Sequence, residues 1–366
     1  MSVPGSSSPH DGTVTQRPFG QMADGEPVLL YTLTNGHGLR AEIMNYGGTM
    51  TRLLVPDRTG RLDDILLGYR TFAEYCAGPC YFGALIGRMG NRLAAGRFTL
   101  DGTPYQLATN NAPGGLPCHL HGGPGGFNRV LWQAEPLPGE AGLRLRYLSP
   151  AGEEGYPGNL DVTVTYRLTE ADEMSIEYHA TSDRATPVNL TQHNYYNLGG
   201  EAGGPVLDHL LTLHASRFTP VDAGLIPTGS LVEVADTPFD FTRPTRIGAR
   251  IQADDPQLRH GGGYDHNWVI DRPGPGLAHA ATAEDPGSGR RMEVWTEEPG
   301  VQFYSGNYID GAQIGKTGRP YATHQGFCLE TQHYPDAPNQ PGFPSVILRP
   351  GAVYHTTTVH RFSAVK

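Results

Sequence analysis

The sequence predicts an all-β protein built as a large antiparallel β-sandwich with few short helices. Three observations support this fold class. Apolar residues alternate with polar ones along many short segments, as in strands with one buried face. Glycine and proline are frequent, 49 and 31 of 366 residues, and they recur between those segments as turn signals. The sequence contains no repeat of fixed length, which a propeller would need.

In chain order, the first element is the best helical candidate, TFAEYCA at residues 71–77, which is two turns long at most. Strands are expected wherever the period is two. In LDVTVTYRL, residues 160–168, large residues alternate with Asp, Thr and Arg. The same alternation predicts further strands over residues 143–148, 174–180, 290–298 and 353–362. These segments favour two large antiparallel sheets packed in one domain.

The domain organisation follows from length and composition. Residues 1–15 begin the chain with a Ser-, Gly- and Pro-rich stretch, and we expect them to form a flexible N-terminal tail. Residues 16–366 are expected to form a single domain, because β-sandwiches can exceed ~200 residues as one unit. Hydrophobic residues make up 38% of the chain, which is enough for a sizeable core.

Charge and hydropathy exclude two classes of partner. The formal net charge is −10, and the densest basic stretch, residues 243–250, lacks the length and aromatic residues of a nucleic-acid site. The first 20 residues do not have the features of a secretory signal. No run of about 18 apolar residues is present to cross a membrane. We therefore expect a cytoplasmic protein that contacts neither nucleic acid nor membranes.

The strong sequence motifs of catalysis are missing. The sequence has no P-loop, no dinucleotide-binding glycine motif followed by a helix, no nucleophile elbow and no His-Glu-x-x-His zinc motif. The four cysteines, Cys76, Cys80, Cys118 and Cys328, do not have the spacing of a zinc site either. In a chain of this size we expect free and mostly buried thiols, as in a reducing compartment.

Several polar residues nevertheless occupy unusual positions. Glu330 follows the apolar run 327–329 and precedes a proline-rich turn, so it either caps a strand in solvent or points into a pocket. His193 lies in a polar segment flanked by aromatic residues, where an isolated histidine is more often structural. Gln302 lies among apolar and aromatic residues, and its amide could read a hydroxyl. The glycine-rich segment 121–127 has no following helix that could hold a phosphate, and a surface loop is an equally good interpretation.

Glycines flank the remaining candidates. The segment IGRMGNRL carries Arg88, Asn91 and Arg92, whose donors suit hydroxyl-rich or anionic ligands, although a solvated loop fits as well. Asp265 and His266 follow three glycines, where the backbone can approach a ligand or simply turn into a strand. Together the candidates supply an acid, a base and several donors, without a metal set or a nucleophile–base pair. That inventory suits proton transfer on a polyhydroxylated substrate.

Nine co-linear segments resemble the aldose 1-epimerases, also called galactose mutarotases. Co-linear segments of this number are far more specific than any single motif. The matching segments are NYGGTM (45–50), GALIGRMGNRLAAGRFTLDG (83–102), LHGG (120–123), EEGYPGNLDVTVTY (153–166), TPVNLTQHNYYNL (186–198), TPFDF (237–241), GYDHNW (263–268), PGVQFYSGN (299–307) and CLETQHYPDAPNQPGFPS (328–345).

The resemblance implies a galactose mutarotase-like supersandwich and assigns a role to individual residues. His193 becomes the general acid and Glu330 the general base. The residues implied to bind the sugar are Asn91, Arg92, His121, Tyr195, Asp265 and Gln302. Neither a cofactor nor a metal is implied.

The segment around the acid departs from the family's usual Asn-His-Ser-Tyr-Phe-Asn. Here Gln192, Asn194 and Tyr196 stand at the three changed positions, and they could alter the tuning of the acid or the sugar preference. Ser305 stands where Thr is commoner. The acid and the base themselves are intact.

The implied activity interconverts the α and β anomers of aldohexoses such as galactose and glucose, with Glu330 ionised and His193 charged. The expected partner is a small aldose, and the expected assembly is a monomer or weak homodimer. Two alternatives stay open. An epimerase of a phosphorylated sugar would need a basic cluster, for which Arg243 and Arg246 are the only candidates. A non-catalytic carbohydrate-binding module could share the same fold.

Overall fold

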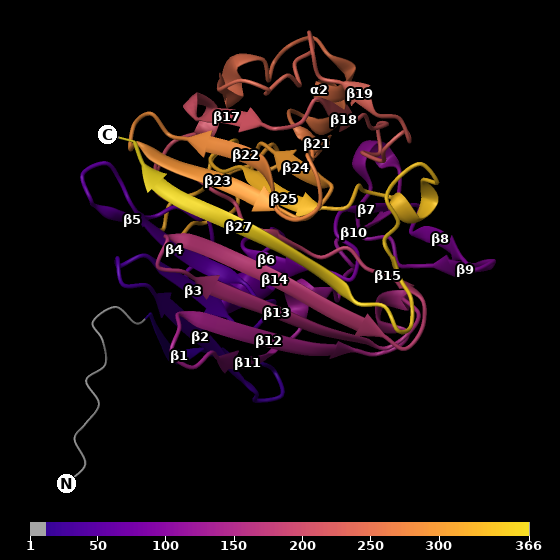
Figure 1. The fold of residues 1–366 in the computed structure, drawn as a ribbon, viewed down its shortest axis with the longest axis horizontal. Helices are drawn as coiled ribbons and strands as arrows, with labels where there is room; N and C mark the ends of the chain where they lie inside the picture. Colours follow the sequence, from indigo (N-terminus) through magenta and orange to yellow (C-terminus); the bar gives the residue numbers. More distant parts are fainter. Residues whose placement is uncertain (1–11, 366) are drawn as a thin grey trace.

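The computed structural model describes residues 12–365, and its secondary structure confirms the all-β fold class. The largest sheet has nine antiparallel strands (Figure 1). Their order across the sheet is β11 (Gln133–Pro136), β12 (Gly142–Ser149), β13 (Leu160–Leu168), β14 (Glu173–Ser182), β27 (Tyr354–Ala364), β23 (Arg290–Thr296), β22 (Ala278–Glu284), β17 (Leu210–Leu213) and β20 (Thr245–Arg246).

Two five-stranded sheets complete the main framework, so the prediction of two large sheets was one sheet short. The first contains β1 (Thr13–Gln21), β2 (Pro27–Thr34), β3 (Arg40–Met44), β4 (Met50–Pro56) and β5 (Leu62–Asp64). The second contains β19 (Val232–Glu233), β18 (Arg217–Thr219), β21 (Asp265–Val269), β24 (Gly300–Tyr304) and β25 (Cys328–Gln332).

Short two-stranded ribbons and two short helices connect the sheets. The ribbons pair β6 (Ala84–Ile86) with β16 (Thr191–His193), β7 (Arg92–Ala94) with β10 (Cys118–Leu120), β8 (Arg97–Leu100) with β9 (Thr103–Gln106), and β15 (Thr186–Pro187) with β26 (Ile347–Leu348). The helices are α1 (Phe72–Ala77) and α2 (Pro256–Gly261).

The predicted strands all lie in the nine-stranded sheet. The segment 160–168 is β13 itself, 143–148 lies within β12, and 174–180 lies within β14. The segment 290–298 becomes β23, which ends two residues earlier, and 353–362 becomes β27. The burial of β13 alternates along most of its length, because one face packs on the core and the other meets solvent.

The predicted helix over residues 71–77 is confirmed as α1. The Thr71 side chain accepts a hydrogen bond from the Glu74 amide, and the Glu74 side chain accepts one from the Thr71 amide, which completes a capping box. Helix α2 was not predicted. Its signals are local, because the Asp255 side chain caps the first turn and Gly262 ends the helix in the left-handed conformation.

One hydrophobic core joins the three sheets. Leu33 and Ile43 of the first five-stranded sheet, Val164 of the nine-stranded sheet, and Trp268 and Phe303 of the second five-stranded sheet belong to the same cluster of fully buried side chains. Burial of such side chains stabilises a fold by roughly 1.5–3 kcal/mol each. The sheets are therefore held in fixed relation to one another by shared packing.

The N-terminal strand begins before the predicted domain boundary. β1 starts at Thr13, so residues 13–15 of the predicted tail form part of a sheet. Residues 1–11 lie outside the described part of the chain. Within residues 12–365, neither helix has the length and apolar character needed to cross a bilayer.

Arg88 is a structural residue and does not bind a ligand. Its guanidinium is 2% exposed and donates hydrogen bonds to Ser149 Oγ at 2.8 Å and to the carbonyls of Ser149, Pro150, Pro157 and Gly158 at 2.8–3.0 Å. Neither alternative considered for Arg88, a hydroxyl-rich or anionic ligand or a solvated loop, is therefore right. The arginine donors instead bind carbonyls at both ends of the single loop that joins β12 to β13.

We predict that Arg88→Met lowers the free energy of unfolding by roughly 3–5 kcal/mol, because several buried carbonyls lose their donors at once. Urea denaturation followed by tryptophan fluorescence measures the change. Arg349→Met is the matched control, since the Arg349–Asp101 pair is more than half exposed on both sides and should contribute little. Equal losses in the two variants would contradict the assignment.

Candidate active site

The polar face of β21, β24 and β25 builds the floor of the site. Successive strand residues point to opposite faces, and directly opposed residues of paired strands share a face. The register opposes Asp265, Tyr304 and Cys328 in one row. Asn267, Gln302 and Glu330 form the next row on the same face. The other face carries Trp268, Val301, Phe303 and Leu329 into the core.

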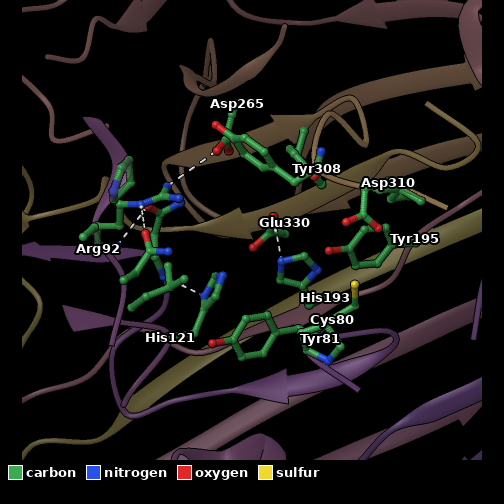
Figure 2. Close-up of a pocket in the computed structure, with 18 of the residues that line it drawn as sticks. Cys80, Tyr81, Arg92, His121, His193, Tyr195, Asp265, Tyr308, Asp310 and Glu330 are labelled. Carbon is green, nitrogen blue, oxygen red and sulfur yellow. Dashed lines mark hydrogen bonds and ion pairs between the residues drawn. The ribbon is translucent and has the colours of Figure 1, made fainter. Parts of the chain in front are cut away.

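A cavity of about 540 Å³ lies over this polar face. That volume falls in the range of small-molecule sites, roughly 300–1,000 Å³. Its lining includes seven of the eight predicted site residues, namely Asn91, Arg92, His121, His193, Tyr195, Asp265 and Glu330. Gln302, the eighth, lies behind Asp265. Figure 2 shows Arg92 and His121 on one side of the His193–Glu330 pair, and Tyr195 and Asp310 on the other.

His193 and Glu330 meet at the centre of the cavity. His193 is the last residue of β16, and Glu330 lies in the middle of β25. The Nε2 atom of His193 lies 3.6 Å from Oε1 of Glu330, and both side chains are at least 94% buried. Among the described residues, the second carboxyl oxygen, Oε2, has no hydrogen-bond partner. A buried acceptor without a partner costs free energy unless a ligand or solvent supplies a donor.

Burial sets the protonation of this pair. It lowers the pKa of His193 to about 4. It also raises the pKa of Glu330 well above its usual range, and the nearby Asp265 carboxylate adds to that rise. Loss of water penalises the charged form of each group. The expectation of an ionised Glu330 beside a charged His193 is therefore not the state that burial favours in the unliganded protein.

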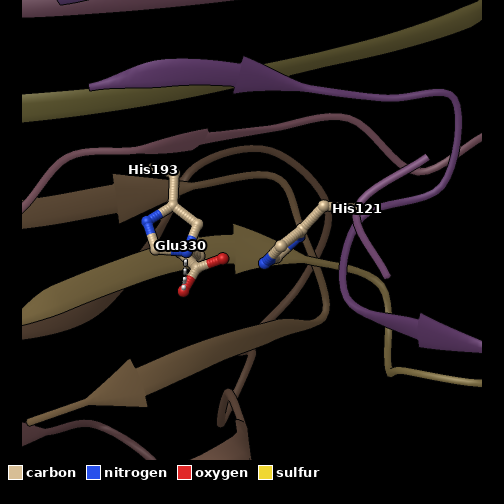
Figure 3. Close-up of side chains that lie close together, drawn as sticks. All are labelled: His121, His193 and Glu330. Atoms are coloured by element: carbon tan, nitrogen blue, oxygen red, sulfur yellow. Dashed lines mark ion pairs between the residues drawn. The ribbon is translucent and has the colours of Figure 1, made fainter. Parts of the chain in front are cut away.

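The His121 ring presents an N–H donor toward the His193–Glu330 pair. Its Nδ1 atom accepts a hydrogen bond from the Asn91 amide at 3.2 Å, so a neutral ring carries its proton on Nε2. Burial lowers the pKa of His121 well below its usual value, which keeps the ring neutral. The side chains of His121, His193 and Glu330 are directed toward one another (Figure 3). Asn91 itself has a φ of 60°, which places its amide behind the histidine.

An ion pair and a hydrogen bond link Arg92, Asp265 and Gln302 along one wall. Gln302 Nε2 donates to Asp265 Oδ1 at 2.8 Å, and Arg92 Nη1 lies 3.6 Å from Asp265 Oδ2. Arg92 Nε also donates to Asn111 Oδ1 at 3.3 Å. These contacts fix the orientation of a charged donor and a charged acceptor that face the cavity, which suits recognition of several hydroxyl groups.

Aromatic rings hold the imidazole of His193 in place. The Tyr195 ring stacks on it at a centroid distance of 5.0 Å, and the Tyr81 ring at 5.7 Å. Tyr81 also contacts His121 edge to face at 4.6 Å. Tyr81 was not among the predicted site residues, because it lies in a segment without a recognisable pattern.

The predictions also missed the far wall of the cavity. Tyr308, Ile309, Asp310 and Gln313 line this wall. Asn111, which was also not predicted, lines another part of the cavity, where it accepts a hydrogen bond from Arg92. The Gln313 side chain is buried, and its Oε1 atom has no partner among the described residues. This segment has neither strand nor helix periodicity, so only its contacts could have shown its place.

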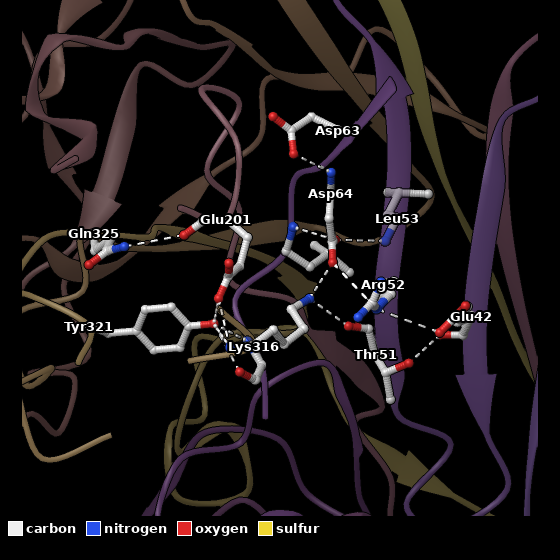
Figure 4. Close-up of polar contacts among 12 residues, drawn as sticks. Glu42, Thr51, Arg52, Leu53, Asp63, Asp64, Glu201, Lys316, Tyr321 and Gln325 are labelled. Carbon is white, nitrogen blue, oxygen red and sulfur yellow. Dashed lines mark hydrogen bonds and ion pairs between the residues drawn. The ribbon is translucent and has the colours of Figure 1, made fainter. Parts of the chain in front are cut away.

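A buried ion pair anchors that wall (Figure 4). The Lys316 ammonium donates to Asp64 Oδ2 at 2.6 Å and to the Thr51 carbonyl at 2.7 Å. The Tyr321 hydroxyl lies 2.5 Å from Glu201 Oε1. The same oxygen accepts a hydrogen bond from the Lys316 backbone amide at 2.8 Å. Burial lowers the pKa of the Lys316 ammonium, and the Asp64 carboxylate opposes that shift. These contacts tie segment 308–321 to the first five-stranded sheet.

Two other predicted segments contain residues with structural roles beside those that line the cavity. His266 is fully buried against the Phe239 ring at 4.8 Å, and burial lowers its pKa to about 3. The glycine-rich segment 121–127 is not a plain surface loop. Gly122 is buried with a φ of 81°, and a Cβ there would lie 1.8 Å from the Gly87 carbonyl oxygen. Only glycine fits that approach, which brings His121 to the cavity.

The three departures around the acid also face the protein interior. Gln192 Oε1 accepts from the Tyr166 hydroxyl at 2.8 Å, and Asn194 Nδ2 donates to the Tyr196 hydroxyl at 2.9 Å. None of the residues Gln192, Asn194 and Tyr196 lines the cavity. They flank His193 in the chain and contact the protein interior rather than the cavity.

His121, His193 and Glu330 are also the only described residues grouped closely enough to hold a metal ion. Their ligand atoms lie within 4.8 Å of one another. Two imidazoles and a carboxylate form the protein ligand set of some zinc enzymes. However, the Arg92 charge acts on both histidines and disfavours a second cation nearby. The absence of a metal stays a prediction, as does the absence of a cofactor.

Comparison with known proteins places these observations in a family. The sequence profile of the family described as "Aldose 1-epimerase" matches residues 29–361. The galactose mutarotase of Sus scrofa is 44% identical over 351 residues, which cover 96% of this chain and 99% of that protein. The aldose 1-epimerase of Escherichia coli is 38% identical over 343 residues, which cover 93% of this chain and 97% of that protein.

A solved structure shows the same fold. The galactose 1-epimerase of Lactobacillus acidophilus superposes with a TM-score of 0.83 at 26% sequence identity, over 97% of this chain and 99% of that one. The fold and the aligned sequences agree over nearly the whole chain. The protein is therefore a member of the aldose 1-epimerase family.

Proposed function

We propose that the cavity interconverts the α and β anomers of an aldohexose, with His193 as general acid and Glu330 as general base. The observation that carries this proposal is the buried His193–Glu330 pair, 3.6 Å apart, on the cavity floor. The curated relatives are a galactose mutarotase and an aldose 1-epimerase. We accordingly expect galactose and glucose as substrates of this protein.

The proposed reaction opens and recloses the sugar ring. The Glu330 carboxylate takes the proton of the C1 hydroxyl, while protonated His193 gives a proton to the ring oxygen. The bond between C1 and the ring oxygen breaks, and C1 becomes the aldehyde carbon. Rotation about the C1–C2 bond by about half a turn presents the other face of the aldehyde. The ring then closes with the proton transfers reversed.

The surrounding residues hold the sugar during these steps. Arg92 and Asp265 present a charged donor and a charged acceptor to the sugar hydroxyls, and Gln302 fixes the Asp265 carboxylate. His121 presents its Nε2 proton beside the pair. Tyr195 packs against the acid. Fixed orientation of this kind reduces the entropy lost on reaching the transition state.

The two alternative functions have less support. Arg243 and Arg246 do not line the cavity, and Arg246 instead pairs with Asp208 at 3.2 Å. The cavity therefore lacks the basic cluster that a phosphorylated sugar would need, and a comparison of galactose with glucose 6-phosphate tests this directly. A non-catalytic binding module has no need for an acid and a base at ion-pair distance.

We predict that the protein accelerates the optical rotation change of freshly dissolved α-D-glucose or α-D-galactose. Glu330→Gln should lower kcat by at least ~100-fold, because a positioned base typically contributes ~10²–10⁴ in rate. Polarimetry measures the rate, and calorimetric titration checks that the variant still binds galactose. No acceleration over buffer at micromolar wild-type protein would contradict the function. A Glu330→Gln variant that keeps most of its rate would place the base elsewhere.

The pH dependence of kcat/KM should be a broad bell. The productive pair carries one proton in total. As the pH falls through the lowered pKa of His193, about 4, the pair takes up a second proton and loses its base. As the pH rises through the raised pKa of Glu330, the pair loses its only proton and with it the acid. The acid limb is therefore expected near pH 4, well below the usual pKa of histidine.

Circular dichroism must be recorded across the same range. Burial also lowers the pKa of His209 and His360 to about 4 and that of His266 to about 3, whereas an unfolded chain protonates these rings near pH 6.5. The unfolded state then binds more protons below pH 6.5, so stability falls as the pH falls toward 4. An acid limb near pH 6.5 with intact secondary structure would contradict the assignment.

We also predict that Lys316→Met raises KM for galactose severalfold with a much smaller effect on kcat. The substitution removes the ion pair that anchors segment 308–321, which carries Asp310 and Gln313. The contacts that hold His193 and Glu330 in place are not changed. It also leaves the Asp64 carboxylate without its buried partner, which should cost roughly 3–5 kcal/mol of stability. Arg246→Met removes an exposed ion pair and is the matched control. An unchanged KM in folded Lys316→Met would contradict the role of the anchor.

A further inference from the structure

The acid histidine has two ring nitrogens, and one strand contacts both. Glu330 Oε1 lies 3.6 Å from Nε2 of His193, and Cys328 Sγ lies 3.6 Å from Nδ1. Cys328 and Glu330 are two residues apart on β25, so they point to the same face with about 6.8 Å between them. That spacing matches the separation needed to reach the two nitrogens on either side of one imidazole ring.

Nδ1 of His193 is the one acceptor that the Cys328 thiol contacts within the described residues. Cys328 is fully buried, and its sulfur has no other hydrogen-bond contact within the described residues. The carbonyl of His193 already accepts the Gly83 amide at 2.9 Å. A thiol that donates its S–H to Nδ1 leaves the proton of a neutral imidazole on Nε2. Burial raises the pKa of the Cys328 thiol well above its usual value, so the thiol keeps its proton.

In His121, too, a donor from the protein contacts Nδ1, but this donor is a backbone amide. Its Nδ1 atom accepts from the Asn91 amide, which can only donate, so Nε2 is the nitrogen that carries the proton. Both cavity histidines are thus contacted at Nδ1 from the protein side. For His121 the main chain makes this contact, and for His193 a side chain makes it. A side chain can be changed by mutation without altering the backbone.

We propose that Cys328 is a positioning residue that keeps the proton of His193 on Nε2, the nitrogen beside Glu330 that faces the sugar. The proposal rests on the acid role proposed above for His193. The thiol serves both protonation states of the ring without moving. It donates S–H to Nδ1 when the ring is neutral, and it accepts from Nδ1–H when the ring is cationic. Cys328 itself does not line the cavity, so it should not affect sugar binding.

Apart from the backbone of His193 itself, whose hydrogen bond to the ring raises the pKa of the imidazole, the other groups around the ring lie elsewhere than at Nδ1. Tyr195 and Tyr81 present their ring faces, and His121 and Glu330 approach from the cavity side. Arg92 acts on the ring only through its charge. Among the described side chains, only Cys328 makes a hydrogen-bond contact with Nδ1 of His193.

The test compares Cys328→Ser with Cys328→Val. Serine keeps a group that both donates and accepts, whereas valine keeps the volume and removes the hydrogen bond. We expect Cys328→Val to lower kcat about five- to tenfold with KM unchanged, a change of the size that loss of one hydrogen bond produces. Cys328→Ser should stay within about twofold of wild type. Cys76→Val is the matched control, because Cys76 lies on α1 and does not line the cavity.

Nitrogen NMR of ¹⁵N-histidine-labelled protein reads the tautomer without turnover, and His193→Gln assigns the signals. Wild type and Cys328→Ser should show a protonated Nε2 and an unprotonated Nδ1 for His193. Cys328→Val should show a mixture of the two tautomers. A protonated Nδ1 in wild type would overturn the proposal, and so would equal loss of kcat in the serine and valine variants.

Two further outcomes separate this proposal from the function that it rests on. A His193→Gln variant with wild-type rate would overturn the acid role of His193, and the proposal with it. A large loss of rate in His193→Gln, together with full kcat in folded Cys328→Val, would overturn the positioning role alone and leave the proposed function intact.

Discussion

The alternation of side chains along β21, β24 and β25 makes the hydrophobic core and the active site two faces of one sheet. Trp268, Phe303 and Leu329 lie on the core face, while Asp265, Gln302 and Glu330 lie on the cavity face. Because the side-chain period is two, a shift of one residue in either pairing would bury the carboxylates in the core and expose the aromatic residues. Packing of the core therefore fixes the register that places Asp265, Gln302 and Glu330 on the cavity face.

Because one sheet supplies only the floor of the cavity, the segments that form its walls come from distant parts of the chain. A sheet face can supply the floor of a cavity, but its walls must come from other segments. β16 brings His193 against β25, the tight approach of Gly122 to Gly87 brings His121, and the Lys316–Asp64 pair holds segment 308–321. Each support is buried, so thermal motion of one wall is limited by contacts made outside the cavity.

The strands could be predicted from the sequence because period-two alternation is a local property that follows from burying one face. The residues of the site could not be predicted that way. Arg88 and Arg92 lie in the same glycine-flanked segment, yet one satisfies loop carbonyls and the other faces the cavity. Their roles depend on which loops pack against them. The family resemblance supplied the predicted site residues, all of which lie in or directly behind the cavity.

What the sequence did not reveal has a common physical reason. Tyr308, Asp310 and Gln313 lie in a segment without periodicity, and its position depends on the contact of Lys316 with Asp64, 252 residues earlier in the chain. No strand of either five-stranded sheet was predicted from alternation. In β21, β24 and β25 every residue is buried, so no alternation of buried and exposed positions marks these strands. Pairings between distant segments are set by the complete fold, so no local pattern encodes them.

The protonation of the His193–Glu330 pair links burial to the reversibility of the reaction. The ionic form, with protonated His193 and ionised Glu330, and the neutral form contain the same number of protons. In the proposed mechanism ring opening starts from the ionic form and ends in the neutral one, and ring closure reverses the change. Burial favours the neutral form and therefore the open-chain state. The Arg92 charge lowers the pKa of Glu330 and Asp265 raises it, so these two residues act on the balance in opposite directions. A catalyst that must convert either anomer needs both forms within reach, because a strong preference for one of them would slow either opening or closure.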